Sequence, residues 1–362
     1  LLRISWVIYD NRTKFAPDYW KRYSVLKDVY GQSQYMMKGW KYWIPDEIAY
    51  SYAAGAYIKG ASPILVESTQ TPLGKYLIGL SILLTGNENV IVAVFFILLL
   101  VGVYILALQL TGSMFFALIA TLLASFERLF VDQLSSTPLM DIFHITFVLY
   151  GLIAASHALQ KRRPTFLIAS YACFGASTMT KVWLIGIVFI LPVTAYILIR
   201  DRRYYLFVIA GFFLMLLITL VSYTRMFMDG YNIVEVLKVQ KWLYWYQGGK
   251  QNRLFTIWPL IFLNRWYVWW GETQVSKDPN WSVSWPLAIG IGILTSVRLL
   301  MISVKSASPA WHLSAISILA YSVFMSMGQP SARYLLPILP ICYAVAAWTA
   351  YRLLRKISAI KA

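Results

Sequence analysis

The chain has 362 residues, of which 59% are hydrophobic, 16% aromatic and only 13% charged. So apolar a composition excludes a soluble globular domain and predicts an all-α polytopic membrane protein. The net charge of +17 does not indicate nucleic-acid binding, because the basic residues are scattered among apolar runs and form no stripe on a polar domain. Membrane lipids are the expected anionic partners.

Residues 1–89 open the chain without a convincing membrane span. The first run, LLRISWVI, is too short to cross a bilayer, which takes about 20 residues. We therefore expect that a first transmembrane helix is truncated or missing. Residues 1–89 then form an external loop with amphipathic juxtamembrane helices.

The stretch 72–86, PLGKYLIGLSILLTG, is apolar but shorter than a span, and two interpretations stay open. We favour a helix along the external membrane surface, because Lys75 and the initial proline suit the interface. If this stretch spanned the membrane instead, residues 1–71 would lie in the cytoplasm.

Hydropathy predicts six transmembrane helices in 90–224, an external aromatic-rich loop at 225–283, and three transmembrane helices with a basic cytoplasmic tail in 284–362. Helices are expected because lipid cannot satisfy exposed backbone groups and no alternating barrel pattern is present. The nine expected spans are 90–110, 113–131, 139–159, 165–181, 183–199, 204–224, 284–303, 310–327 and 334–351.

Basic clusters predict which loops are cytoplasmic. Short positively charged loops stay on the cytoplasmic side, and four such clusters alternate with the spans in a way that puts the C-terminus inside. Residues 1–89 and 225–283 are then external. The clusters are 161–163, Arg200 with Arg202 and Arg203, Arg298 with Lys305, and Arg352 with Arg355 and Lys356.

Five ionisable residues are expected to meet on the external face. Ionisable groups in or beside membrane helices cost several kcal/mol unless they are paired or used, so a cluster at one depth predicts a functional site. The five are Asp46, Glu47, Asp141, Lys181 and Arg333.

Several motifs keep a recognisable order. An acidic pair opens DEIAYSYAAGAYIKG and is followed by QTPLGKYLIGL; SSTPLMD, STMTKVW, IWPLIFLNRWYVWWGE and SARYLLPILP come later. Together they resemble the dolichyl-phosphate-mannose protein mannosyltransferases of the C-type glycosyltransferase superfamily, whose Asp-Glu pair precedes a His-Pro-Pro-Leu-x-Lys element. The last motif resembles the late Arg-Tyr-Leu-Leu-Pro run of the related lipid-sugar transferases. The resemblance covers roughly residues 44 to 351 and implies the C-type glycosyltransferase fold.

Three positions depart from the family pattern. Gln70 stands where the family usually has His, and Thr71 replaces a proline. Ser136 occupies the place of an arginine that many members carry and that is expected to help hold the carrier phosphate.

The resemblance implies a glycosyltransferase in the cell membrane that acts on the extracytoplasmic face. It would move mannose or a similar hexose from a polyprenyl or dolichyl phosphate to a protein or lipid acceptor. An acceptor hydroxyl is a poor nucleophile near neutral pH, so a carboxylate must take its proton, and Asp46 is the expected base. A single displacement would invert the anomeric centre.

Fixed cations are expected to stabilise the charge on the departing phosphate oxygen. The candidates are Lys75, Lys181 and Arg333, with Lys75 favoured because it belongs to the matched element. Glu47 would orient Asp46, contact the acceptor or hold a cation, and these roles stay open.

The sugar or acceptor pocket is expected to include aromatic side chains, because the apolar faces of sugars stack on Trp and Tyr. The candidates are Asp141, Gln70, Trp269, Trp270 and Glu272.

No metal site or other cofactor is expected. The three histidines, His144, His157 and His312, lie in separate predicted spans without ligand spacing. Cys173 and Cys342 both lie in apolar stretches and indicate core packing.

Two alternative functions stay open. A transporter of lipid-linked sugars would also need polar groups within the membrane, although no clear internal repeat of the kind found in transporters is present. A degenerate family member serving as an accessory subunit of a membrane complex would account for the departures at Gln70 and Ser136.

Overall fold

The computed structural model describes residues 2–36, 38–248, 254–267, 275–302, 308–328 and 330–361. Most residues in these ranges are helical, so the predicted all-α class is confirmed. Within the described ranges the strands are β1 (Trp266–Tyr267) and β2 (Val275–Ser276), which form a small antiparallel hairpin.

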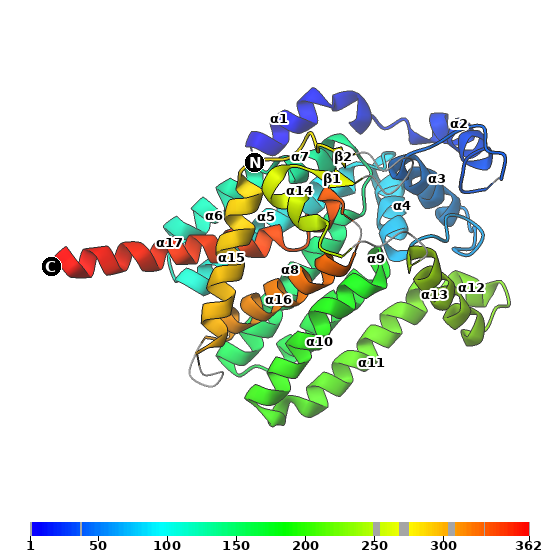
Figure 1. The fold of residues 1–362 in the computed structure, drawn as a ribbon. Helices are drawn as coiled ribbons and strands as arrows, with labels where there is room; N and C mark the ends of the chain where they lie inside the picture. The colour runs from blue at the N-terminus through cyan, green and yellow to red at the C-terminus, as the bar shows by residue number, and fades with distance from the viewer. Residues whose placement is uncertain are drawn as a thin grey trace.

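The N-terminal segment forms short helices that lie along one side of the helical bundle (Figure 1). Its last helix, covering the ambiguous stretch, has 13 residues and packs against its neighbour α3. The sidedness of this segment stays a prediction. The helices are α1 (Leu2–Asp10), η1 (Arg12–Phe15), α2 (Tyr19–Gly31), α3 (Asp46–Ile58) and α4 (Leu73–Thr85).

The central part of the chain forms the long helices of the bundle. Figure 1 shows α8, α9, α10, α11 and α16 running side by side. The helices are α5 (Val90–Thr111), α6 (Met114–Phe126), α7 (Arg128–Ser135), α8 (Asp141–Lys161), α9 (Thr165–Thr180), α10 (Trp183–Arg200), η2 (Arg202–Tyr204) and α11 (Tyr205–Ser222).

The aromatic-rich segment and the C-terminal helices complete the molecule. The last helix extends beyond the bundle, so its C-terminal turns are exposed (Figure 1). The helices are α12 (Thr224–Met228), α13 (Ile233–Gly248), α14 (Ile257–Leu263), α15 (Ser284–Leu300), α16 (Pro309–Met327), η3 (Ala332–Leu335) and α17 (Leu339–Lys361).

Helix α8 is the centre of the bundle and α11 lies at its edge. In their most apolar windows, 83% of α8 but only 17% of α11 is buried by the rest of the protein. Helices α9 and α11 approach closely at Gly211, where a Cβ atom would lie 2.4 Å from the ring of Tyr171. Small residues permit such close packing between membrane helices. The remaining apolar surface of α11 is therefore available to lipid.

Five of the described helices are long and apolar enough to cross a membrane, or six if one bent pair is counted as a single span. The bent pair is α6 and α7, which meet at 52° within the predicted span 113–131. Helices α9 and α15 have 16 and 17 residues and are shorter than the usual span. A polytopic membrane protein is nevertheless confirmed, and the exact set of spans and their sidedness stay predictions.

Glu127 explains the break between α6 and α7. Its backbone is extended, and its side chain accepts a hydrogen bond from the backbone N–H of Leu129, which caps α7. The carboxylate also accepts hydrogen bonds from Ser284 (2.6 Å), from the indole N–H of Trp285 (2.9 Å) and from the Tyr343 hydroxyl. One buried carboxylate thus joins the break to α15 and α17.

Candidate active site

Asp46 lies in the first turn of α3, directly after the extended residue Pro45. A carboxylate is favourable there because the unpaired N–H groups of a helix N-terminus carry partial positive charge. Asp46 accepts a hydrogen bond of 3.0 Å from the Tyr35 hydroxyl and one of 3.0 Å from Nη1 of Arg333. Asp46 is therefore held both by Tyr35, 11 positions earlier in the chain, and by Arg333, 287 positions later.

Arg333 connects Asp46 to a second carboxylate, Asp141. Its Nη2 and Nε donate to the same oxygen of Asp141 at 2.6 and 3.2 Å. The other oxygen of Asp141 accepts a hydrogen bond from the ammonium of Lys181. The four residues Asp46, Arg333, Asp141 and Lys181 form what we term the charge cluster.

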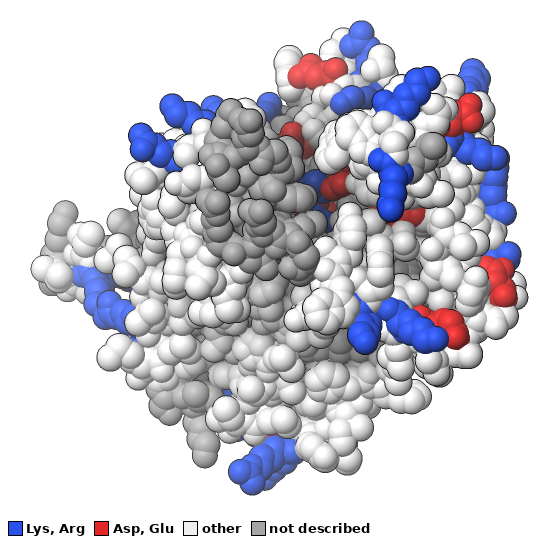
Figure 2. All heavy atoms as spheres, turned by 45° about the vertical axis from the view of Figure 1, so that its right-hand side comes forward, with Lys and Arg blue, Asp and Glu red and all other residues white. Residues whose placement is uncertain are grey.

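The charge cluster combines two carboxylates with two cations, so its formal charge is zero. It is graded in exposure: the side chains of Asp46 and Arg333 are 33% and 28% exposed, whereas those of Asp141 and Lys181 are 7% and 8% exposed. Figure 2 shows acidic and basic side chains together in a recess of this face. The outer half of the cluster can thus meet a ligand while the inner half is fixed.

Asp46 is ionised in this setting. Burial alone would raise its pKa, but the positive charges of Arg333 and Lys181 outweigh this effect, and the pKa of Asp46 lies below its ordinary value of 3.8. A carboxylate in this state accepts protons but does not donate them near neutral pH.

Glu47, the second residue of the acidic pair, lies outside the charge cluster. It is partly exposed and has no ion-pair partner within the described ranges. Burial raises its pKa above the ordinary value of 4.5. The two adjacent carboxylates therefore differ in environment, because only Asp46 is paired with a cation.

Lys75 forms a separate, fully buried site. Its ammonium pairs with the carboxylate of Glu67 and donates to the backbone oxygens of Glu67 (2.5 Å) and Gln70 (2.9 Å). Neither residue belongs to the charge cluster. Burial lowers the pKa of Lys75 and raises that of Glu67. Lys75 thus fixes the segment that contains Gln70.

That segment supports the turn that carries Lys181. The backbone N–H and the hydroxyl of Thr71 both donate to the Lys181 carbonyl oxygen, at 3.1 and 2.9 Å. Gly74 packs tightly beside them, since a Cβ atom there would lie 2.6 Å from both the Met140 sulfur and the Thr180 carbonyl oxygen. The matched PLGK element thus contacts the residues that directly precede Asp141 and Lys181.

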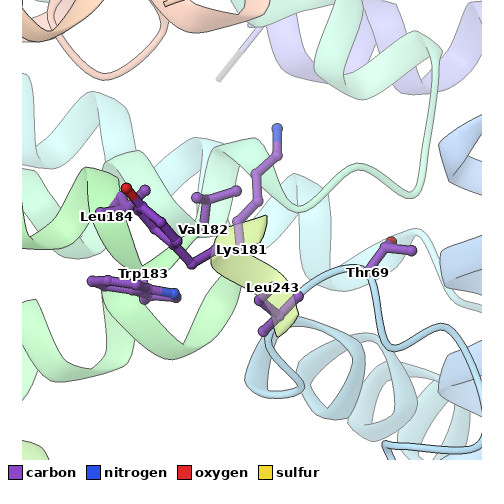
Figure 3. A pocket seen from close by; sticks show the side chains of 7 residues that line it. Thr69, Lys181, Val182, Trp183, Leu184 and Leu243 are labelled. Carbon is purple, nitrogen blue, oxygen red and sulfur yellow. The ribbon is translucent and has the colours of Figure 1, made fainter. Parts of the chain in front are cut away.

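Lys181 lies between α9 and α10, where the backbone is irregular. Beneath it is a small pocket whose lining includes Thr69, Trp183 and Leu243. Figure 3 shows the Lys181 side chain extending away from Trp183 and Leu243. The ammonium therefore faces Asp141 while its backbone borders an apolar pocket.

The remaining predicted residues are less informative. Trp269, Trp270 and Glu272 lie outside the described residues. Gln70 lies next to the buried Lys75, and Ser136 donates a hydrogen bond of 3.1 Å to Asp132.

In the described part of the chain, no group of three or more metal-ligating side chains is placed to hold a metal ion.

Sequence reasoning missed Tyr35 and Glu67. Tyr35 is one of many tyrosines in the first segment, and its role depends on a loop that returns to Asp46. Glu67 lies eight residues before Lys75, and its proximity to the matched element was the available signal.

Comparison with known proteins gives a family match over the middle of the chain. Residues 69–226 match the family model described as "Dolichyl-phosphate-mannose-protein mannosyltransferase". The family resemblance is therefore confirmed. No curated protein sequence matches the chain. The mannosyltransferase-like segment runs from the loop fixed by Lys75 through α11 and includes Asp141 and Lys181.

Solved structures extend the similarity over most of the chain. The apo structure of ArnT from Cupriavidus metallidurans is 15% identical, with a TM-score of 0.57 over 88% of this chain and 59% of that chain. The structure of the same protein bound to undecaprenyl phosphate is also 15% identical, with a TM-score of 0.56 over 94% of this chain and 63% of that chain. This chain thus has the C-type glycosyltransferase fold and spans about three fifths of the length of these structures.

Proposed function

We propose that this protein is a membrane glycosyltransferase that moves a sugar from a polyprenyl phosphate carrier to a hydroxyl group of a protein or lipid acceptor. The observation that carries the proposal is the bridge of Arg333 between Asp46 and Asp141. This bridge places the proposed base, Asp46, beside the cation Arg333 in the more exposed half of the charge cluster. The family match and the structure of ArnT bound to undecaprenyl phosphate support the carrier class.

The reaction is a single displacement. The acceptor oxygen bonds to the anomeric carbon of the sugar while the bond from that carbon to the carrier phosphate oxygen breaks. The proton of the acceptor hydroxyl passes to Asp46, and the electron pair of the broken bond stays on the phosphate. The anomeric centre is inverted because the nucleophile enters opposite the leaving group.

Arg333 and Lys181 are the cations that would stabilise the leaving phosphate. Arg333 is the better placed, because its side chain is 28% exposed and a guanidinium can bind two oxygens at once. A phosphate that takes one of these donors weakens the hold of Arg333 on Asp46. The carboxylate then becomes more basic at the moment when an acceptor hydroxyl is activated.

Lys75 would act indirectly in this scheme. Its charge is neutralised by Glu67 in a fully buried site, so it fixes residues 67–71 and, through Thr71, the turn of Lys181. We propose that its contribution is the geometry of that turn and not direct contact with the phosphate.

Glu47 is proposed to contact the acceptor. It adjoins the base but has no cation of its own among the described residues, and it is partly exposed. A carboxylate in that position can accept a hydrogen bond from a second hydroxyl of the incoming molecule.

The family name favours mannose or a similar hexose as the transferred sugar and dolichyl or another polyprenyl phosphate as the carrier. The basic clusters favour an extracytoplasmic active site, because they assign the opposite ends of the spans to the cytoplasm. The proposed sugar or acceptor pocket comprises Gln70, Asp141, Trp269, Trp270 and Glu272.

The experiment is a transfer assay with purified protein in lipid vesicles, a radiolabelled polyprenyl-phosphate hexose and a set of hydroxyl acceptors. We expect labelled acceptor and free polyprenyl phosphate in equal amounts. Asp46→Asn is expected to slow transfer by about 100-fold or more, because the base is removed. Asp229→Asn is the control, since Asp229 pairs with Arg225 outside the charge cluster.

Two outcomes would contradict the proposal. Movement of the labelled lipid across the vesicle without covalent transfer would support a transporter. Absence of turnover with every donor, from a folded protein that still binds other membrane proteins, would support an accessory subunit.

A further inference from the structure

A second site lies at the far end of the bundle from the charge cluster. Helix α10 runs 18 residues from Trp183, next to Lys181, to Arg200, which separates the two ends by about 27 Å. A cavity of about 610 Å³ opens there. It is lined by Leu159, Arg162, Pro164, Arg200, Asp201, Arg203, Tyr204 and Phe207.

Three arginines from two connections between helices line this cavity. Arg162 follows α8 in a left-handed conformation, Arg200 ends α10, and Arg203 lies in the turn before α11. Arg162 and Arg203 are exposed, and neither forms an ion pair within the described ranges. Arg200 donates to the Tyr196 hydroxyl at 2.9 Å. The cavity therefore offers donors suited to a phosphate.

Asp201, the acidic residue in the cavity lining, stabilises the turn before α11. Its side chain accepts a hydrogen bond of 3.0 Å from the backbone N–H of Arg203 and so caps the turn η2. Against the three arginines it leaves a formal surplus of two positive charges at the cavity.

The other walls of the cavity are apolar and continue onto the membrane-facing surface. Tyr204 and Phe207 border the cavity, and α11 then presents Leu206, Ile209 and Phe213 outward, all exposed in the isolated protein. A ligand that fits both surfaces is acidic at one end and apolar at the other.

We propose that this cavity binds the phosphate headgroup of an anionic membrane phospholipid, with its acyl chains along the outer face of α11. Basic pockets between membrane helices recognise such headgroups, and aromatic side chains favour the headgroup layer. If these arginines served only to keep their loops on the cytoplasmic side, they would not need to line one cavity. The site is independent of the transfer reaction, because it lies one helix length from the charge cluster.

The test measures binding of dioctanoyl-phosphatidylglycerol to the purified, detergent-solubilised protein by native mass spectrometry and calorimetry. Dioctanoyl-phosphatidylcholine and inorganic phosphate are the comparison probes. We expect saturable binding of the anionic lipid, much weaker binding of the zwitterionic lipid and no competition by equimolar phosphate. The double variant R162Q/R203Q is expected to bind about 30-fold more weakly, from the usual contribution of each basic residue.

The matched control is R298Q/K356Q, which removes two exposed basic residues predicted to lie on the same side of the membrane but away from the cavity. It is expected to change the affinity by less than about twofold. Equal losses in both variants, or equally tight binding of inorganic phosphate, would overturn the site. If the first variant does not fold, a photoreactive phosphatidylglycerol should crosslink the wild-type protein within 198–207, and labelling elsewhere would refute the proposal.

Discussion

Arg333 holds Asp46 and Asp141 through different nitrogen atoms, at 3.0 Å through Nη1 and at 2.6 Å through Nη2. The fork of a guanidinium is the feature that makes this bridge possible. Because Asp141 is nearly buried while Asp46 is a third exposed, the bridge fixes Arg333 on its inner side and leaves its outer side open to exchange.

Arg333→Lys should separate charge from geometry. Lysine keeps the positive charge but cannot donate to both carboxylates in the same way, so the expected loss in the transfer rate is about 100-fold. The measurement is kcat with the labelled donor. Arg225→Lys, in the partly exposed pair with Asp229 outside the charge cluster, should leave kcat unchanged. Full activity of Arg333→Lys would mean that only the charge matters.

Asp141→Asn should lower stability strongly. The change leaves the nearly buried Lys181 and the inner side of Arg333 without a carboxylate, and breaking a buried ion pair costs about 3–5 kcal/mol. Unfolding by denaturing detergent in mixed micelles measures the difference. Asp229→Asn removes a partly exposed pair between residues four positions apart and should cost less than about 1 kcal/mol. Equal losses in the two variants would contradict the structural role of Asp141.

Variants of the pair Lys75 and Glu67 test whether Lys75 binds the carrier phosphate itself or only fixes the turn that carries Lys181. Lys75→Met alone leaves a buried carboxylate and should destabilise the protein by about 3–5 kcal/mol. The double variant K75M/E67Q removes both charges and should regain most of this stability. We expect its transfer activity to recover as well, to within about tenfold of wild type. Recovery of stability without recovery of activity would instead indicate that Lys75 binds the phosphate.

The pH dependence of transfer should identify the base. The pKa of Asp46 is lowered, so its ion pair and its basic form are present above the ordinary value of 3.8 and are lost only as pH falls through the lower folded value. The profile of kcat/KM, which reports the free enzyme, is therefore expected to show no acid limb from this group between about pH 5 and 8. An acid limb in that range that disappears in Glu47→Gln would assign the base to Glu47, whose pKa is raised.

Much of this architecture could be predicted from the sequence because apolar runs are long and polar residues within them are few. The helical class and the polytopic character follow from composition alone. The break at Glu127 could not be predicted, since it depends on Ser284, Trp285 and Tyr343, which arrive from helices much later in the chain. Hydropathy averages over such a position and merges the two helices.

The candidate site, like the fold, could be predicted only in part. The predicted topology puts the acidic pair in an external loop and Asp141, Lys181 and Arg333 at the external ends of spans, which predicts that all five charges meet. The structure joins four of them, without Glu47. The different surroundings of Lys75 could not be predicted, because its neutralisation by Glu67 depends on how the loop between α3 and α4 folds. A motif match identifies a lysine but does not indicate which carboxylate lies beside it.

The contact between Asp46 and Arg333 joins residues 287 positions apart in the chain. During synthesis, Asp46 and Asp141 leave the ribosome well before Arg333 does. The charge cluster can therefore form only after residue 333 has been synthesised, and Asp46 lacks its guanidinium partner until that point.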